Sequence, residues 1–368
     1  MIRKPPYWIG CFVLAVFLAA TGCQKAEEKS APPPAEPAPA ASVSPLDNLP
    51  LGLDKDSAQV PRDNSITGEK VELGRLLYFD GRLSRDGTIS CASCHNPKHG
   101  WTDEGPTSTG IRGQKGGRRA PTVLNRLFST AQFWDGRAAS LEEQAKGPIQ
   151  NPIEMGFTHE EAVARFSKIA EYSPYFEKAF GTPEVTIDRI AQAIATFERT
   201  VVTGDSPVDR WQRKGEETAV SESVKRGLQV FNGKARCITC HAGFNFTDER
   251  FHNLGVGMDK EKPDLGRYDV TKQDADKGAF KTPGLRNLKS RAPYMHDGSE
   301  KTLETVVDFY DKGGLKNPRL DIQMKPLGLT PDEKKDLIAF LDALNGSEPQ
   351  VVIPEVFPGG WKPGMPVE

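Results

Sequence analysis

A five-residue run, Cys-x-x-Cys-His, occurs twice in this chain, as "CASCH" and as "CITCH". In such a run the two thiols can bond a porphyrin and the histidine can bind its iron. Paired cysteines in an exported chain are ordinarily a disulfide, and a lone Cys-x-x-Cys is a redox motif. Two copies, each with histidine next in line, instead favour two covalently bound haem c groups. The residues that would hold them are Cys91, Cys94 and His95, and Cys237, Cys240 and His241.

Residues 1–22 have the features of a lipoprotein-type signal peptide. Arg3 and Lys4 precede the apolar run "WIGCFVLAVFLAA", which is short for a membrane span, and the small residues "ATGC" end at Cys23. We expect a lipid on Cys23, with an ordinary secreted signal peptide as the alternative. Gln24, rather than aspartate, favours the outer membrane of a Gram-negative bacterium. The chain is therefore expected in the periplasm, with that lipid as its membrane contact.

Composition limits the remaining possibilities. The chain has 368 residues, enough for two ordinary domains, and a net charge of −2 provides no basic surface for nucleic acid. Its 35 glycines and 29 prolines predict a loop-rich protein. Residues 23–50 are rich in proline and alanine and are expected to form an extended tether.

The two halves of the chain repeat each other beyond the cysteines. "PTVLNRLFSTAQFWDGRAASLE", from Pro121, aligns without a gap on "PGLRNLKSRAPYMHDGSEKTLE", from Pro283, so that Trp134 stands opposite His296. Such repetition predicts two copies of one haem domain. We place them at residues 51–205 and 206–350, followed by a C-terminal tail at 351–368.

Apolar residues at helical spacing predict helices within 68–80, 186–202 and 330–344, and the last opens with a capping-box pattern from Thr330 to Glu333. No stretch alternates long enough for a substantial sheet. The predicted fold is mainly α: two tandem cytochrome c-like haem domains, related by internal duplication and rich in loops.

The repeat also bears on the sixth position of each iron. Tyr310, in "LETVVDFYDKGG", falls at an expected helix end, and the same register in the first half gives Pro148. Proline cannot ligate iron. If Tyr310 is the sixth ligand of the second haem, the first haem is left open. Met295 and Met324 are the rival ligands.

Several segments together resemble the bacterial dihaem cytochrome c peroxidase family and its MauG-like branch, over roughly residues 60–345: "RLLYFDGRLSRDGTISCASCH", "APTVLN", "FWDGRA", "EQAKGP", "GLRN" and "APYMHDG". The resemblance implies a peroxidatic N-terminal haem and a C-terminal haem that passes electrons. It implies that Trp134 lies between the haems and that Gln144 and Glu154 handle the peroxide. Trp134 could instead fill a domain interface, and Glu154 could instead be a helix-start carboxylate.

Three features depart from that family's pattern. The loop "STGIRGQKGGRRAPT" has Ile111 and Arg112 where many members carry a removable histidine, and Arg112 could stabilise charge if this loop folds inward. Tyr310 replaces the usual axial methionine, as in MauG. Arg119 and Arg291 stand where a calcium site uses asparagine and threonine, which argues against calcium.

The other histidines are expected to do less. His99 is predicted to be a surface or hydrogen-bonding residue, and His159 and His252 to be solvent-facing or structural. His296 is predicted to organise the second haem pocket by hydrogen bonding.

The resemblance leaves three functions open. The first is reduction of hydrogen peroxide with electrons from a small periplasmic donor such as a c-type cytochrome. The second is MauG-like oxidation of a tryptophan or tyrosine on a partner protein. The third is a non-catalytic electron carrier, against which Gln144, Glu154 and the missing histidine argue, since a carrier needs both irons six-coordinate.

Overall fold

The computed structural model describes residues 45–367. The predicted signal peptide, the lipid site at Cys23 and nearly all of the tether lie outside these described residues. Among the residues that are described, no helix combines the length and the apolar character that crossing a membrane requires.

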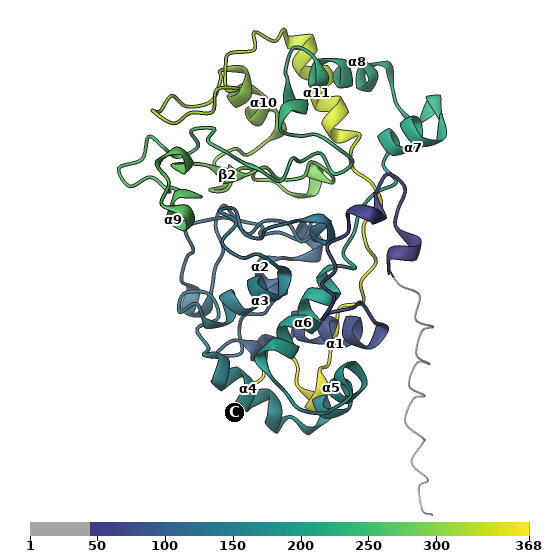
Figure 1. Cartoon of the computed structure of the whole chain (residues 1–368), viewed down its shortest axis with the longest axis vertical. Helices are drawn as coiled ribbons and strands as arrows, with labels where there is room; N and C mark the ends of the chain where they lie inside the picture. Colours follow the sequence, from purple (N-terminus) through teal and green to yellow (C-terminus); the bar gives the residue numbers. More distant parts are fainter. Residues whose placement is uncertain (1–44, 368) are drawn as a thin grey trace, which may run out of the picture. The chain divides into compact units, whose positions relative to one another are not determined.

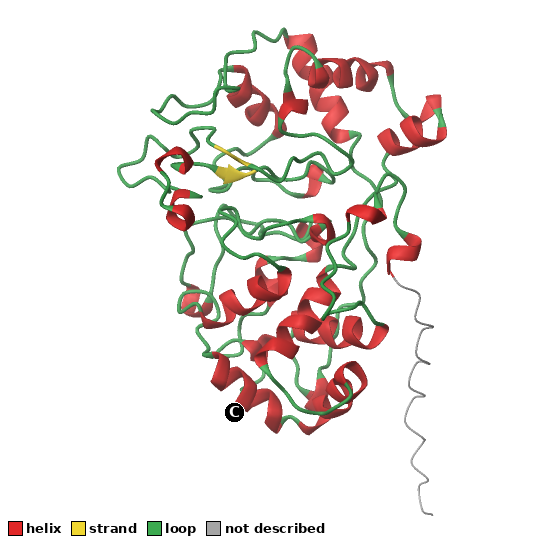
Figure 2. Ribbon diagram, viewed as in Figure 1, coloured by secondary structure: helices red, strands yellow, loops and turns green. Residues whose placement is uncertain are grey.

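Helices and loops make up the described chain, with one small sheet (Figure 2). The sheet is antiparallel and pairs Phe251 with Lys281 and His252 with Phe280. A mainly α, loop-rich fold is therefore confirmed. The elements are α1 (Gly68–Phe79), α2 (Cys91–Cys94), α3 (Leu141–Gln150), α4 (His159–Lys168), α5 (Ser173–Phe180), α6 (Ile187–Glu198), α7 (Pro207–Lys214), α8 (Glu222–Asn232), β1 (Phe251–His252), α9 (Tyr268–Thr271), β2 (Phe280–Lys281), α10 (Leu303–Asp311) and α11 (Pro331–Asp342).

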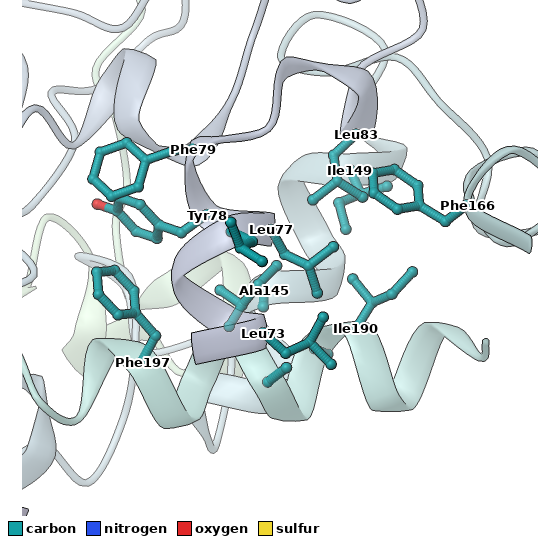
Figure 3. Packing of buried hydrophobic residues seen from close by; sticks show 14 of the residues in the cluster. Leu73, Leu77, Tyr78, Phe79, Leu83, Ala145, Ile149, Phe166, Ile190 and Phe197 are labelled. Atoms are coloured by element: carbon teal, nitrogen blue, oxygen red, sulfur yellow. The ribbon is translucent and has the colours of Figure 1, made fainter. Parts of the chain in front are cut away.

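Helices α1 and α6 form the centre of the first of two apolar clusters (Figure 3). Leu73 and Leu77 of α1 and Ile190 of α6 are fully buried there, and each such side chain stabilises the fold by about 1.5–3 kcal/mol. The helices approach so closely at Gly74 that a Cβ there would overlap the carbonyl oxygen of Ala193. The predicted helix within 68–80 is confirmed, and so is the one within 186–202.

Helices α8 and α11 form the second cluster in the same way. Phe231 of α8 meets Phe340 of α11 with 5.0 Å between ring centroids, and a Cβ at Gly227 would overlap the carbonyl oxygen of Asp336. The predicted capping box at the start of α11 is present, with Thr330 and Glu333 each bonding the other's backbone N–H. In Figure 1, α8, α10 and α11 lie on one side of a layer of loops, and α1 and α3–α6 on the other.

The two aligned segments adopt matching local conformations. Asn125 and Asn287 are both left-handed, with φ of 61° and 55°, and so are Phe133 and Met295, with φ of 65° and 70°. Each segment then runs into a helix, α3 or α10, that begins at the aligned leucine. The aligned segments therefore share local backbone geometry as well as sequence.

The last residues of the chain return to the first cluster. Phe357 and Trp361 are buried there, and Arg82 donates to the carbonyl oxygen of Pro358 at 2.9 Å. Nothing in the sequence pattern of residues 351–368 indicated this return.

Candidate active site

Two cavities open onto the two Cys-x-x-Cys-His runs. The first is lined by Cys91, Cys94 and His95, and the second by Cys237, Cys240 and His241. All four thiols are free, so neither pair is a disulfide. Each run folds as a tight turn, in which the histidine N–H donates to the carbonyl oxygen of the first cysteine, at 3.0 Å in the first run and 2.8 Å in the second. Each turn thus directs two thiols and one imidazole to a single cavity.

Burial perturbs the acidity of the residues in both runs. Burial lowers the pKa of His95 to about 4, so its imidazole is neutral, as iron ligation requires, and its Nδ1 is buried without a partner. His241 Nδ1 contacts the carbonyl oxygen of Phe246 at 3.0 Å, which leaves Nε2 for a metal. Burial raises the pKa of Cys94 and of Cys237 to about 12, so both are protonated thiols.

The first cavity brings together the residues predicted for peroxide chemistry. Trp134, Gln144 and Glu154 all line it together with His95, and so does Pro148. Helix α3 supplies Gln144 and Pro148, and the turn after it supplies Glu154. The predicted proximity of these side chains is therefore present, while their roles stay predictions.

Glu154 is the carboxylate of this group, and its surroundings perturb its acidity. Burial raises its pKa, and the positive charge of Arg137 opposes that rise. Arg137 lines the same cavity, bonds Asp135 at 3.0 and 3.1 Å and stacks on Phe133, with 3.4 Å between its Cζ and the ring centroid. The expectation for Arg112 is wrong, because its side chain is exposed and does not line the cavity. Among the arginines that line this cavity, Arg137 is the one whose charge lowers the pKa of Glu154, and the segment "FWDGRA" already contained it.

A common wall separates the two cavities. Trp134, Arg119 and Arg126 line both of them. The indole Nε1 of Trp134 donates to the carbonyl oxygen of Arg119 at 2.8 Å, which fixes the orientation of the ring. His296 lines the second cavity, stacked on Phe280 with 3.6 Å between ring centroids. Burial lowers the pKa of His296 to about 4, so this ring is neutral.

The second cavity contains every predicted sixth ligand. Tyr310, at the end of α10, lines it together with Met295 and Met324. Burial raises the pKa of Tyr310, and the sulfurs of Cys237 and Cys240 raise it further. The phenol therefore keeps its proton unless a bound cation displaces it. Tyr310 as the ligand stays a prediction, and Met295 and Met324 stay its rivals.

Buried charges that the sequence analysis did not single out also face the cavities. Glu198 of α6 lines the first cavity, where burial raises its pKa to about 8, against the effect of the neighbouring Arg199 and Arg126. Buried Lys281 forms an ion pair with partly buried Glu249 at 2.9 Å, and both line the second cavity. Local sequence could not reveal either feature, since each depends on contacts between distant segments.

The residues at the expected calcium position do not fit calcium. Arg119 donates to the carbonyl oxygens of Ala292 at 3.1 Å and Arg291 at 3.4 Å, and Arg291 donates to that of Gly284 at 2.7 Å. Both arginines are buried, and burial lowers the pKa of Arg291 to about 10. Two cations already occupy the carbonyl oxygens that a hard metal would need.

The remaining histidines make surface or structural contacts. The His99 side chain is 39% exposed and lies 3.7 Å from Glu104. His159 Nε2 contacts the carbonyl oxygen of Lys146 at 2.9 Å, so it is structural. His252 is also structural, since it lies between two carboxylates at the second cavity.

Comparisons with known proteins show which family this chain resembles. The family model described as di-haem cytochrome c peroxidase matches residues 68–218. The methylamine utilization protein MauG of Methylorubrum extorquens is 44% identical over 304 residues, which cover 82% of this chain and 85% of that protein. The cytochrome c551 peroxidase of Pseudomonas aeruginosa is 40% identical over 304 residues, which cover 80% of this chain and 83% of that protein.

Solved structures with the same fold include a MauG-like protein associated with microbial copper homeostasis. It superposes with a TM-score of 0.73 at 34% identity, over 78% of this chain and 93% of that one. The diheme peroxidase BthA of Burkholderia thailandensis superposes with a TM-score of 0.67 at 22% identity, over 78% of this chain and 87% of that one, which speaks to the fold alone.

Proposed function

Because this chain belongs to the di-haem cytochrome c peroxidase family and is thus an oxidoreductase that uses peroxide, we propose that it reduces hydrogen peroxide to water in the first cavity. Electrons would reach that cavity through the second. One observation carries the proposal: Gln144, Glu154 and Trp134 line the same cavity as His95. The two halves would then be duplicated haem domains with different tasks.

The haem iron bound by His95 would supply the position where peroxide binds and is reduced. Cys91 and Cys94 would hold the porphyrin by thioether bonds, and Cys237 and Cys240 would do the same in the second cavity. The neutral imidazoles of His95 and His241 present a free nitrogen lone pair for ligation.

Glu154 would move the proton that peroxide cleavage requires. As a carboxylate it accepts the proton of the nearer peroxide oxygen, and as a carboxylic acid it returns that proton to the leaving oxygen. Partial burial favours the carboxylic acid and the charge of Arg137 favours the carboxylate, so Glu154 can adopt both protonation states. The amide of Gln144 can donate and accept hydrogen bonds and would orient the peroxide.

The second cavity would feed electrons through the common wall. Trp134 belongs to both linings and is held by its bond to the Arg119 carbonyl oxygen. Tyr310 would be the sixth ligand in the second cavity, where an anionic phenolate favours high oxidation states of iron. Pro148 holds the corresponding place in the first cavity and cannot ligate, so that position stays available to peroxide.

A second candidate function is peroxide-dependent oxidation of a tryptophan or tyrosine on a partner protein. Two relatives, at 44% and 42% identity, are named methylamine utilization protein MauG, and Tyr310 fits that candidate better than an axial methionine does. A non-catalytic electron carrier is the least favoured reading, because it leaves Gln144 and Glu154 without a role.

The partners and the place of action follow from the same proposal. We place the protein in the periplasm, held to the outer membrane by a lipid on Cys23. The electron donor would be a small c-type cytochrome, or the partner would be a protein substrate.

The deciding experiment mixes the fully oxidised holoprotein with hydrogen peroxide and a reduced small c-type cytochrome. Rapid cytochrome oxidation without prior reduction is the expected result. A long-lived oxidised spectrum with little cytochrome turnover would favour the protein-oxidation candidate. No reaction with peroxide would contradict both.

A further inference from the structure

We propose that His252 is a positioning residue for the second haem: it joins the turn after the second haem-attachment run to the distal segment, residues 312–329, and so holds that segment over the second cavity. This inference rests on the proposed function only in taking the second cavity to hold a haem. Its geometry is independent of which residue ligates the iron.

The imidazole of His252 lies between two carboxylates from different parts of the chain. Its Nδ1 is 2.6 Å from an oxygen of Asp321, and its Nε2 is 2.9 Å from an oxygen of Asp248. A ring that contacts carboxylates through both nitrogens satisfies both contacts only when both nitrogens carry protons. Two carboxylate oxygens within hydrogen-bond distance of the two ring nitrogens therefore favour a doubly protonated, cationic ring.

Asp248 connects this cation to the attachment run. Its N–H donates to the carbonyl oxygen of Cys240 at 2.8 Å. Cys240, Asp248 and His252 also lie close enough to hold a metal ion. We do not assign one, because Cys240 is needed for haem attachment and both nitrogens of His252 already have partners.

Asp321 connects the same cation to the distal segment. Its N–H donates to the carbonyl oxygen of Asn253 at 2.9 Å, and its own carbonyl oxygen accepts the N–H of Met324 at 2.9 Å. Asp321, Met324 and Leu327 all line the second cavity. The segment has no helix or strand of its own, so its shape depends on such contacts.

The His252 contact is distinct from the other ties of this segment. Asn253 and Asn317 bond each other's side chains at 3.0 and 3.1 Å, and the N–H of Leu315 donates to the carbonyl oxygen of Leu254 at 3.2 Å. These ties anchor the beginning of the segment. The ion pair with His252 and the bond from the Asp321 N–H to the Asn253 carbonyl oxygen together anchor the part that carries Met324.

Two substitutions with opposite charge effects test the inference in the holoprotein. His252→Asn removes a positive charge and Asp321→Asn removes a negative one, yet both break the same contact. Each is expected to speed amide exchange in residues 312–329 by roughly tenfold to a hundredfold, since a charged hydrogen bond is lost. Each is also expected to lower the midpoint potential of the second haem, because water reaching it favours the ferric state.

Matched controls are His159→Asn, whose ring contacts a carbonyl oxygen away from both cavities, and Asp269→Asn, on the exposed helix α9. The double variant His252→Asn/Asp321→Asn is expected to exceed neither single variant. Unchanged exchange, or potentials that shift in opposite directions in the two single variants, would overturn the proposal. Failure of the proposed function would show separately, as absent peroxide turnover in the unsubstituted holoprotein.

Discussion

The indole ring of Trp134 meets the imidazole ring of His296 edge to face, with 6.4 Å between their centroids and 67° between their planes. The two residues hold the same register position in the two halves, and each comes from the loop that lines its own half's cavity. Their contact therefore joins the two repeats at the wall between the cavities.

Trp134→Phe tests this wall as an electron route. The variant keeps an aromatic ring but loses the bond to the Arg119 carbonyl oxygen, so we expect slower reoxidation of the second haem by peroxide, by roughly tenfold or about 1.4 kcal/mol in barrier. Rapid-mixing absorbance measures this rate. Trp211→Phe, on α7 and outside both linings, is the control, and an equal effect there would remove the special role of Trp134.

Glu154→Gln is expected to lower peroxide turnover by about 10²–10⁴-fold with unchanged haem content, since it removes the proton carrier. The dependence of the turnover rate on pH tests which protonation state of Glu154 is needed. The first step needs the carboxylate, so the rate should rise with pH through a pKa above the ordinary value of 4.5, and the variant should lose that rise. Glu160→Gln, at the exposed start of α4, should behave as the unsubstituted protein. A variant with full turnover would assign the proton transfer elsewhere.

The sixth ligand of the second haem can be identified by a pair of substitutions. We expect Tyr310→Phe to raise the potential of the second haem and to change its ferric spectrum, because a phenolate ligand stabilises the oxidised state. Met324→Leu should change neither. Redox titration with absorbance detection measures both variants. The opposite pattern would make Met324 the ligand.

Calcium should have no part in this protein's stability or turnover. At the expected calcium position, Arg119 and Arg291 already donate hydrogen bonds to the backbone carbonyl oxygens. Treatment with a chelator is therefore expected to leave the melting temperature and the rate of peroxide turnover unchanged. Adding calcium back should have no more effect than adding magnesium. An activity lost to the chelator and restored by calcium alone would contradict this.

The buried guanidinium of Arg286 donates to the two carboxylate oxygens of Asp209 at 2.7 and 2.9 Å. Asp209→Ala is expected to destabilise the fold by about 3–5 kcal/mol, because it leaves that guanidinium without its carboxylate partner. Burial alone raises the pKa of Asp209, but the bonds from Arg286 and Ser206 outweigh it and hold the pKa below 3.8. The contribution of this pair is thus present at neutral pH and is lost as the pH falls below 3.8 through the lowered value.

Thermal denaturation against pH measures that loss. Glu217→Gln, which removes an exposed partner of Lys225, should leave the stability almost unchanged, because solvent screens that ion pair. Equal effects of the two substitutions would mean that burial of the Arg286 pair contributes nothing.

Local pattern by itself determined the two Cys-x-x-Cys-His runs, the helices α1, α6 and α11, and the register that aligns Trp134 with His296. These follow from spacing within a few residues, or from one half compared with the other. Gln144 and Glu154 were predicted from the resemblance to a family, at the spacing that the family uses. Both line the first cavity.

Only the tertiary structure decided which distant groups meet. Arg119 reaches the Ala292 carbonyl oxygen, His252 reaches Asp321, and Phe357 returns to the first apolar cluster. Arg112 stays outside while Arg137 lines the cavity. The physical reason is that hydrogen bonds and ion pairs between remote segments depend on how two apolar clusters bring loops together, and no local periodicity records that approach.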